Sequence, residues 1–343
     1  MRVVASPLGK RSLSSLIRPA LIAKAFTSVL VLAACFMSAR ALPAQSAARV
    51  AAPLFVGYLP DYKGVSFTDY ASKINFSHMT HLNIAFGNPP KCSGPCTVAS
   101  DMTFSVKSQT DADVDAVVKR AHAAGVKVLL SIGGGGGDQL ILQFYNAGLS
   151  QALTASLSSY LKAHNLDGAD IDIEDPSNMG APFATFVQTV ATTLRPQGKL
   201  VTAAVAKYLQ DSMPDAALRQ FDFINVMTYG SYAAATTALQ FYATNKKVPK
   251  NQIVLGVPFF GSAADDSKEE DYATIMANYP NAWRVDMVGG GPLDAGKGFN
   301  YVGEDTMAKE VQLGKQYGGV MVWELMGDAP APHSLLQVIH ANL

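Results

Sequence analysis

The stretch Asp167-Gly168-Ala169-Asp170-Ile171-Asp172-Ile173-Glu174 is the most informative segment of this 343-residue chain. Its apolar residues alternate with acids, which is the pattern of a buried strand with two different faces. Because alternate side chains of a strand share a face, Asp170, Asp172 and Glu174 are predicted to point together, with roughly 7 Å between successive acids. Like charges held this closely raise the pKa of at least one carboxyl. We therefore expect one acid to keep a proton near neutral pH and to act as a general acid.

From residue 54 onward, apolar runs of strand composition alternate with segments of helical periodicity. Near-continuous apolar strands separated by helices are typical of a parallel sheet that is buried on both faces. Eight such strands favour an α/β fold of the TIM barrel type, (β/α)8, over an open doubly wound sheet. No linker or shift in composition divides residues 54–343, so we predict a single domain there. The predicted strands are 55–59, 79–86, 126–132, 166–174, 200–205, 221–228, 253–259 and 319–325.

The first 41 residues have the features of a targeting segment and not of the fold. A basic stretch precedes an apolar run from Ala25 to Met37, and Ala39-Arg40-Ala41 offers a small-residue cleavage site. The apolar run is too short for a transmembrane span. We predict a signal peptide at 1–41, a flexible mature tail at 42–53, and export to the periplasm or the medium. Leu32-Ala33-Ala34-Cys35 also resembles a lipoprotein lipobox, which leaves anchoring through Cys35 as an alternative.

The composition of the chain argues against several kinds of partner. There are 27 basic and 27 acidic residues, so no charge imbalance favours nucleic acid or an anionic membrane surface. In an oxidising compartment Cys92 and Cys96 are expected to form a local disulfide. None of the six histidines lies within the ten residues after this pair, and two thiolates alone do not make a zinc site. We therefore predict neither a metal nor a cofactor.

Residues at the carboxyl ends of the predicted strands outline a candidate site, because barrel enzymes build their active sites at that end. The acids stand there among aromatic side chains. Sugar faces stack on aromatic rings and sugar hydroxyls bond to polar groups, so the set favours a carbohydrate site. The candidate residues are Tyr58, Phe86, Ser131, Asp172, Glu174, Met227, Tyr229, Phe259, Phe260, Trp323 and Glu324.

The acidic stretch fits the pattern D-x-x-D-x-D-x-E, and with it the chain resembles glycoside hydrolase family 18, the chitinases and related endo-β-N-acetylglucosaminidases. The resemblance extends over essentially the whole predicted mature chain, because five other segments match. These are Gly57-Tyr58 with Asn83-Ile84-Ala85-Phe86 on the first two strands, Ser131-Ile132-Gly133-Gly134 for S-x-G-G, Met227-Thr228-Tyr229 for M-x-Y, and the run from Gly319 to Trp323 for G-x-M-x-W.

The resemblance implies a retaining mechanism in which the 2-acetamido group of the substrate, and not an enzyme carboxylate, attacks the sugar. Glu174 would protonate the leaving oxygen and later activate water. Asp172 would hold the acetamide N–H and stabilise the oxazolinium-like intermediate. Asp170 would lie deeper and share a proton with Asp172, with Tyr58 and Ser131 as hydrogen-bond supports.

Four further residues complete the site that the resemblance implies. Tyr229 would hold the acetamide carbonyl for attack, and Trp323 would form the apolar floor beneath the distorted sugar. Phe86 and Met227 are carried over as wall residues. The implied partner is an oligo- or polysaccharide that contains N-acetylglucosamine, bound by a monomer.

The chain departs from the family pattern at several positions. Gly230 follows Tyr229 where many members carry Asp or Asn, which puts one polar contact in doubt. Ile173 and Asp175 replace the Trp and Tyr of many bacterial chitinases and look more like the plant-type branch. The segment 261–302, which we expect to be irregular, is shorter than the α+β domain that many processive chitinases insert there. We therefore expect a TIM barrel without a large inserted α+β domain, and an open groove that cuts internally.

Three functions stay open on this sequence. The first is a chitinase that cleaves β-1,4-linked N-acetylglucosamine polymers. The second is an endo-β-N-acetylglucosaminidase that cuts the chitobiose core of N-glycans with the same residues. The third is a chitin-binding lectin without catalysis, although such proteins characteristically lose the acid at the position of Glu174.

Two readings of single motifs fit less well. Calcium ligands usually come from loops that add carbonyl oxygens, which three acids on a strand do not provide. The glycine run 133–137 lacks the Gly-Lys-Ser/Thr ending of a phosphate-binding loop, so tight packing at a strand end is expected there.

Overall fold

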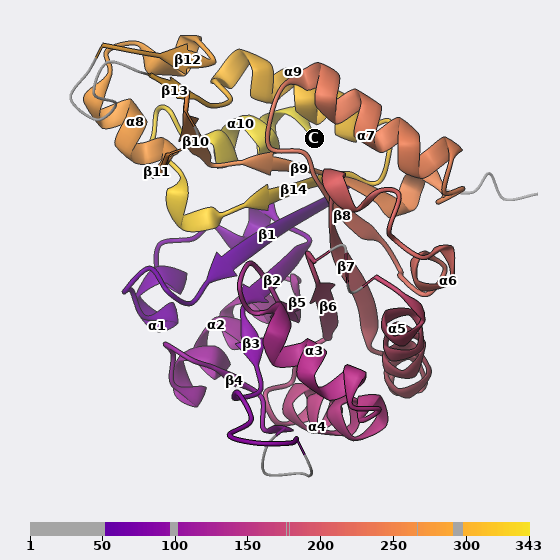
Figure 1. The fold of residues 1–343 in the computed structure, drawn as a ribbon. Helices are drawn as coiled ribbons and strands as arrows, with labels where there is room; N and C mark the ends of the chain where they lie inside the picture. The colour runs from indigo at the N-terminus through magenta and orange to yellow at the C-terminus, as the bar shows by residue number, and fades with distance from the viewer. Residues whose placement is uncertain (1–51, 97–101, 176, 178, 266, 291–297) are drawn as a thin grey trace, which may run out of the picture. The chain divides into compact units, whose positions relative to one another are not determined.

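The structure is a computed structural model that describes residues 52–96, 102–175, 177, 179–265, 267–290 and 298–343. The predicted signal peptide, Cys35 and all but the last two residues of the predicted tail lie outside the described residues. Within Ala51–Leu343, which packs as one compact unit, eight parallel strands close into a barrel (Figure 1). Around the barrel they follow the order β1-β14-β9-β8-β7-β6-β5-β2. The prediction of a TIM barrel is therefore confirmed.

All eight predicted strands are present, with ends that differ by up to three residues from the predicted ones. They are β1 (Leu54–Pro60), β2 (His81–Ala85), β5 (Lys127–Gly133), β6 (Gly168–Asp172), β7 (Leu200–Ala206), β8 (Ile224–Met227), β9 (Ile253–Pro258) and β14 (Gly319–Trp323).

Helices surround this barrel on the outside (Figure 1). They are α1 (Phe67–Ala71), α2 (Asp111–Ala123), α3 (Asp138–Asn146), α4 (Ser150–Ala163), α5 (Ala181–Leu194), α6 (Asp215–Leu218), α7 (Tyr232–Thr244), α8 (Tyr272–Asn278), α9 (Glu304–Gly314) and α10 (Leu335–Asn342). Within the described ranges, none of the helices is long and apolar enough to cross a membrane.

Local sequence explains where a helix such as α2 begins and ends. Thr110 accepts a hydrogen bond from the Asp113 backbone, and the Asp113 side chain accepts one from the Thr110 backbone, which closes a capping box. Gly125 follows the helix with a φ of +77°, a left-handed conformation that glycine adopts without strain. The chain can thus turn directly into β5.

The barrel strands separate two cores. On β1, Val56 and Tyr58 belong to a small buried cluster inside the barrel, whereas Phe55 and Leu59 belong to the large cluster between strands and helices. Period-two alternation of side chains produces this division. Each large apolar side chain that leaves water in the outer core contributes about 1.5–3 kcal/mol. The inner cluster shares the barrel with polar residues, and these build the site.

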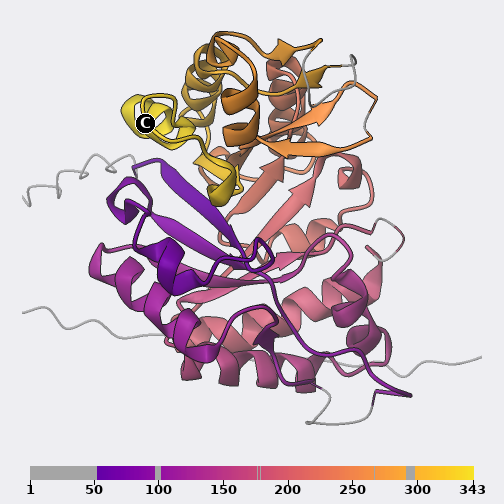
Figure 2. The same cartoon turned by 90° about the vertical axis from the view of Figure 1, so that its left-hand side faces the viewer.

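The segment between β9 and α9 is not irregular, and that expectation was wrong. It forms a four-stranded antiparallel sheet of order β11-β10-β13-β12, with β10 at Phe260–Ala263, β11 at Glu269–Asp271, β12 at Met287–Val288 and β13 at Phe299–Asn300. Figure 2 shows this small sheet beside α8, on the opposite side of the barrel from α2 and α4. Strands of two to four residues are too short to show a period-two pattern in the sequence. The absence of a large inserted α+β domain is confirmed.

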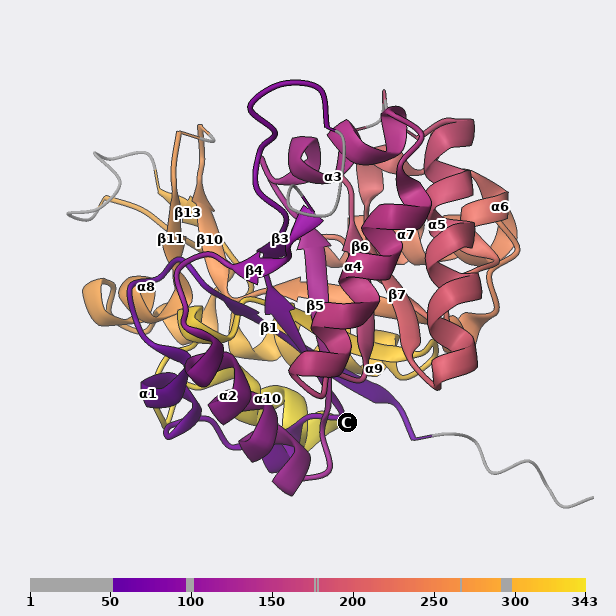
Figure 3. The same ribbon diagram turned by 90° about the horizontal axis from the view of Figure 1, so that it is seen from below.

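A second excursion leaves the barrel after β2. It contains β3 (Gly87–Asn88) and β4 (Ser105–Val106), which pair antiparallel. Figure 3 shows this segment next to α3. It brings a loop from the N-terminal part of the chain to the carboxyl end of β5, close to the acidic strand.

Candidate active site

Asp170 is fully buried inside the barrel and is satisfied on all sides. Its carboxylate accepts hydrogen bonds from the hydroxyls of Tyr58 at 2.7 Å, Ser131 at 2.8 Å and Thr202 at 2.6 Å, and from the Asn225 amide at 3.4 Å. Ser131 and Thr202 reach it because the parallel register places them directly beside Asp170. Burial raises the pKa of Asp170, and these hydrogen bonds oppose the rise. Asp170 therefore fixes the polar network beneath the site.

Asp172 is as deeply buried but differently surrounded. It lies at the end of β6, and its Oδ1 has no hydrogen-bond partner among the described residues. Burial raises the pKa of Asp172 well above its ordinary value, and the nearby charges of Glu174, Asp170 and Asp138 add to the rise. A raised pKa is what the sequence predicted for acids at alternate positions of a strand. The shared proton between Asp170 and Asp172 stays a prediction.

Glu174 stands beyond the strand and not on it, because β6 ends at Asp172. The Glu174 backbone N–H donates to the Asp138 carboxylate at 2.9 Å and not to a neighbouring barrel strand. Its side chain accepts a hydrogen bond from the largely exposed Tyr208 hydroxyl at 2.9 Å. A Cβ on Gly135 would lie 3.7 Å from Glu174 Oε1, an ordinary van der Waals distance, so the glycine loop passes directly beside the acid. The sequence thus predicted the correct end of the barrel for Glu174, but it placed this residue in a strand, whereas it lies in the loop after β6.

The acids open into a cleft of about 1040 Å³ at the carboxyl ends of the strands. Trp323 stacks on Phe86 with ring centres 5.7 Å apart, and its ring meets Tyr58 edge-on at 5.6 Å. Tyr229 packs edge-on against Phe260 at 5.5 Å. The other predicted cleft residue that lines this space is Met227.

Nearly all predicted site residues therefore meet in one place. Asp172, Glu174, Tyr229, Trp323, Phe86 and Met227 line the cleft, while Asp170, Tyr58 and Ser131 form the network below it. Phe259 is completely buried in the outer core, so this residue does not face the cleft.

The glycine run after β5 packs tightly, as the sequence suggested. Gly134 has a φ of +81°, and a Cβ there would lie 2.3 Å from the Phe86 ring. At Gly137 a Cβ would lie 2.1 Å from the Gly133 carbonyl oxygen. Neither approach tolerates a side chain. The run therefore brings the backbone against Phe86 and the start of α3 toward Glu174.

Several residues of the site escaped the sequence analysis. Thr202, Asn225 and Tyr208 carry ordinary polar side chains, and only the register and the loops bring them to the acids. Asp138 could have been predicted from the sequence. It is the first acid after the glycine run at the end of β5, and β5 is the strand that pairs with β6.

Glu324 takes part in an ion-pair group behind Trp323. The Lys63 ammonium lies 2.9 Å from Glu324 Oε1 and 2.6 Å from Asp271 Oδ1. Glu324 is buried, and its Oε2 accepts the Met326 backbone N–H at 2.8 Å. Lys63 therefore links the loop after β1, the end of β14 and the small sheet. On the Trp323 side of the cleft, Lys63 thus joins Glu324 to Asp271 of the small sheet.

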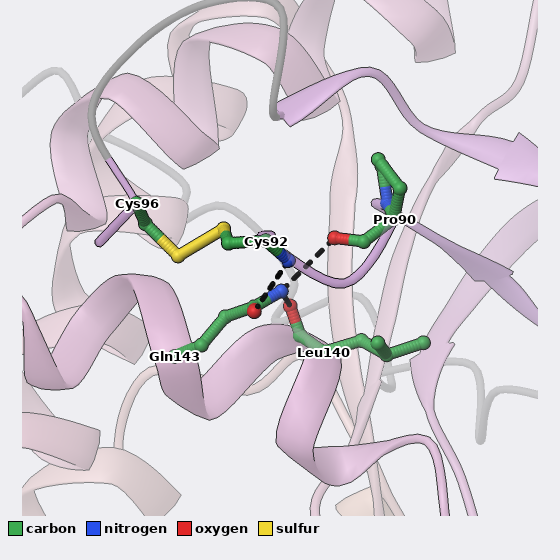
Figure 4. The surroundings of a disulfide bond; sticks show 5 residues. All are labelled: Pro90, Cys92, Cys96, Leu140 and Gln143. Atoms are coloured by element: carbon green, nitrogen blue, oxygen red, sulfur yellow. Dashed lines mark hydrogen bonds between the residues drawn. A yellow bond between two sulfur atoms is a disulfide. The ribbon is translucent and has the colours of Figure 1, made fainter. Parts of the chain in front are cut away.

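Cys92 and Cys96 form a disulfide in the loop between β3 and β4 (Figure 4). Gln143 of α3 accepts the Cys92 backbone N–H at 3.0 Å and donates to the Pro90 carbonyl oxygen at 3.0 Å. Pro90 and Lys91 line the cleft. The disulfide loop is therefore a wall of the site that is fastened to α3.

A metal site is not evident in the part of the chain that the structure describes. No group of three or more His, Cys, Asp or Glu side chains there is arranged to hold an ion. Asp170, Asp172 and Glu174 instead have protein hydrogen-bond donors or other acids around them.

A (β/α)8 barrel with a carboxyl pair in an aromatic cleft at the carboxyl ends of its strands has the architecture of a glycoside hydrolase. The family model described as Glycosyl hydrolases family 18 matches residues 55–328. The chain belongs to this family.

Solved structures similar to this chain include two bacterial chitinases. A family 18 chitinase of Flavobacterium johnsoniae is 28% identical with a TM-score of 0.71, over 84% of this chain and 93% of that one. A chitinase of Bacteroides thetaiotaomicron is 24% identical with a TM-score of 0.72, over 84% and 96%, and supports the fold alone.

Two fungal relatives among the curated proteins cover less of the chain than these structures do. Chitinase 1 of Rhizopus niveus is 30% identical over an alignment of 185 residues, which covers 46% of this chain and 34% of that protein. A chitinase-like effector of Moniliophthora perniciosa is 30% identical over 123 residues, which are 35% and 26%. The chain thus spans about a quarter to a third of the length of these two relatives.

Proposed function

We propose that the protein hydrolyses β-1,4-linked N-acetylglucosamine polymers by substrate-assisted, retaining catalysis. One observation carries the proposal. Asp172 is buried beside the cleft with an unpartnered Oδ1, next to the half-buried Glu174. A buried acceptor without a partner costs stability, about 1–3 kcal/mol, unless a ligand satisfies it. The N–H of a 2-acetamido group is a donor of the right kind.

The reaction follows from the positions of the two acids. Glu174 donates its proton to the glycosidic oxygen, and the bond from C1 to that oxygen breaks. The acetamide carbonyl oxygen bonds to C1 from the opposite face, and Asp172 stabilises the resulting positive charge. Glu174, now a carboxylate, takes a proton from water as that water attacks C1, and the bond from C1 to the acetamide oxygen breaks, which restores the acetamide group. Two inversions at C1 restore the β configuration.

Residues around the pair orient the sugar. The Tyr229 hydroxyl makes only a weak contact, 3.9 Å from the Met321 sulfur, so an acetamide carbonyl can replace it. Burial and the nearby carboxylates raise the pKa of Tyr229 well above its ordinary value, which keeps this hydroxyl a donor. Trp323 offers an apolar ring to the sugar face.

The cavities around Glu174 suit a polymer that is cut internally. The main cleft adjoins a cavity of about 270 Å³ that contains Tyr208, and Glu174, Met227 and Tyr229 line both. Sugar residues of one chain could therefore extend from the main cleft past the acid. This supports internal cleavage of a chain over release of single end units.

Two other functions compete with this proposal. An endo-β-N-acetylglucosaminidase would use the same residues on the chitobiose core of N-glycans. A binding protein without turnover is the other, because some relatives bear the name chitinase-like effector. The presence of Glu174, with its oriented backbone and its Tyr208 contact, favours an enzyme.

Product analysis separates the three functions. Purified protein is incubated with chitin and with a high-mannose glycoprotein, and soluble products are identified by mass spectrometry. We expect N-acetyl-chitooligosaccharides from chitin alone, and a loss of at least roughly 100-fold in both Glu174→Gln and Asp172→Asn. Release of N-glycans would favour the endoglycosidase. Binding to chitin without any product from the wild type would favour the lectin.

We also propose that the protein is exported and acts as a monomer. The predicted signal peptide at 1–41 supports export, with anchoring through Cys35 as the alternative. Fractionation of the producing cell with mass analysis of the mature N-terminus tests both, and membrane-bound protein that Cys35→Ala releases would favour the anchor. Light scattering on the purified protein tests the monomer.

A further inference from the structure

Asp138 is a buried acid that the proposed reaction does not yet use, and its neighbours Gly137 and Leu140 line the cleft. It is the first residue of α3 and directly follows the glycine run after β5. Its side chain is 7% exposed, and its Oδ1 has no hydrogen-bond partner in the described part of the chain. It forms no ion pair with a described lysine, arginine or histidine. A buried, unpaired acid at this place needs an explanation.

The contact of Asp138 with the general acid is direct. Asp138 Oδ2 accepts the Glu174 backbone N–H at 2.9 Å. Because β6 has already ended at Asp172, this bond holds a loop that lacks strand pairing. Helix α3 is itself held in place, since Gln143 ties it to Cys92 and Pro90 of the disulfide loop (Figure 4). The position of Glu174 is thereby fixed to a rigid element through one carboxylate.

The charge of Asp138 also faces the catalytic acids. The titratable groups around it are Glu174 and Asp175 from the loop after β6, Asp172 from β6, Tyr208 from the turn after β7, and Tyr145 from α3 itself. Burial raises the pKa of Asp138 to about 6, with smaller contributions from the Glu174 and Asp175 carboxylates. In turn, its charge helps to raise the pKa of Asp172. A negative charge here favours protonated carboxyls in the cluster.

We propose that Asp138 is a positioning residue that fixes the backbone of Glu174 and adds the negative charge of its own carboxylate to the acid cluster. The expected change in kcat rests on the proposed function, whereas the positioning of the Glu174 backbone does not. The two roles are separable, because the hydrogen bond needs an acceptor at Asp138, whereas the electrostatic effect needs its charge.

Two substitutions separate these roles. Asp138→Asn keeps an oxygen that can accept the Glu174 N–H but removes the charge. Asp138→Ala removes both. Asp111→Asn is the matched control, because Asp111 is likewise the first residue of a helix, α2, and stands away from the cleft. Thermal unfolding of each variant reports whether the fold survives, and Asp138→Asn keeps the test valid if Asp138→Ala does not fold.

The pH dependence of kcat and crystal structures provide the readouts. In Asp138→Asn we expect the alkaline limb of kcat to move to lower pH by about one unit, since the acid cluster ionises more easily without the charge of Asp138. In Asp138→Ala we expect kcat to fall roughly 100-fold with KM nearly unchanged, because the acid is misplaced. Crystal structures should show Glu174 displaced in Asp138→Ala and in place in Asp138→Asn.

An unchanged alkaline limb in Asp138→Asn would overturn the proposal, and so would an undisplaced Glu174 backbone in Asp138→Ala. Failure of the proposed function has a different signature, which is a wild type without turnover. In that event the crystal structures alone still test whether Asp138 positions Glu174.

Discussion

At the scale of single residues, Asp170 and Asp172 show how neighbours give two like side chains different roles. Both are buried on β6, two positions apart. Asp170 accepts four hydrogen bonds from protein side chains, whereas Asp172 Oδ1 accepts none in the described chain. The first therefore belongs to the architecture of the barrel, and the second is free to meet a substrate.

Removal of the Tyr58 hydroxyl tests the role of the network under the site. Tyr58→Phe deletes a buried donor to the Asp170 carboxylate, and hydrogen bonds to charged groups contribute about 1.5–3 kcal/mol. We expect the free energy of unfolding in urea to fall by about that amount. Tyr242→Phe is the control, because that buried hydroxyl meets only a backbone carbonyl at 3.4 Å. Equal losses in the two variants would contradict the role given to Asp170.

Site residues differ in how far the sequence could predict them. The alternating pattern made Asp170, Asp172 and Glu174 predictable. Acids at every second position of a buried strand cost stability, so they indicate a function. Thr202 and Asn225 carry no such signal, since their role depends on the register of β7 and β8 with their neighbours. Tyr208 was equally hidden, because it acts from a short helical turn after β7.

At the scale of elements, long apolar strands were predictable and short polar ones were not. The eight barrel strands stand out because both of their faces are buried. The small sheet of β10 to β13 is built from strands too short for a pattern, so it was mistaken for irregular chain. The end of β6 was also misplaced, because the side chain of Asp138 takes the hydrogen bond that strand pairing would have used.

Helix α9 contains a buried acid whose ionisation should weaken the fold. Glu310 is 2% exposed, and burial, assisted by the charge of Asp286, raises its pKa to about 8 from 4.5. Below pH 4.5 both the folded and the unfolded chain hold this proton. Between about 4.5 and 8 only the folded chain holds it, so stability falls as pH rises, by at most about 1.4 kcal/mol per unit.

Glu310→Gln removes this dependence. Urea unfolding at several pH values should show the variant gaining stability over the wild type as pH rises from 5 to about 8, with the difference level above that. The control is Asp305→Asn, in the exposed first turn of the same helix. A difference between Glu310→Gln and wild type that does not change with pH would show that Glu310 is not held protonated.

At the scale of the whole molecule, barrel closure is what assembles the site. Tyr58 comes from the first barrel strand and Trp323 from the last, yet their rings touch because β1 pairs with β14. The order of strands could be predicted from the sequence, since a (β/α)8 pattern has one closed arrangement. The excursions could not. The disulfide loop and the small sheet, which line and support the cleft, follow no repeat.

Two cavities meet at Glu174, because the main cleft and the cavity that contains Tyr208 are both lined by Glu174, Met227 and Tyr229. Polar side chains fasten the excursions that wall the cleft, among them Gln143 at the disulfide loop and Lys63 beside Trp323. The scaffold therefore holds the acids in a groove and not in a closed pocket.

The most direct test of the central claim is the anomer that the enzyme releases first from a β-1,4-linked N-acetylglucosamine tetramer, followed by proton NMR. Attack by the substrate acetamide, with Glu174 as acid and base, predicts that the new reducing end appears as the β anomer and only later equilibrates. Glu174→Gln should release neither anomer at a measurable rate. Initial release of the α anomer, or no hydrolysis by the wild-type protein, would contradict the account.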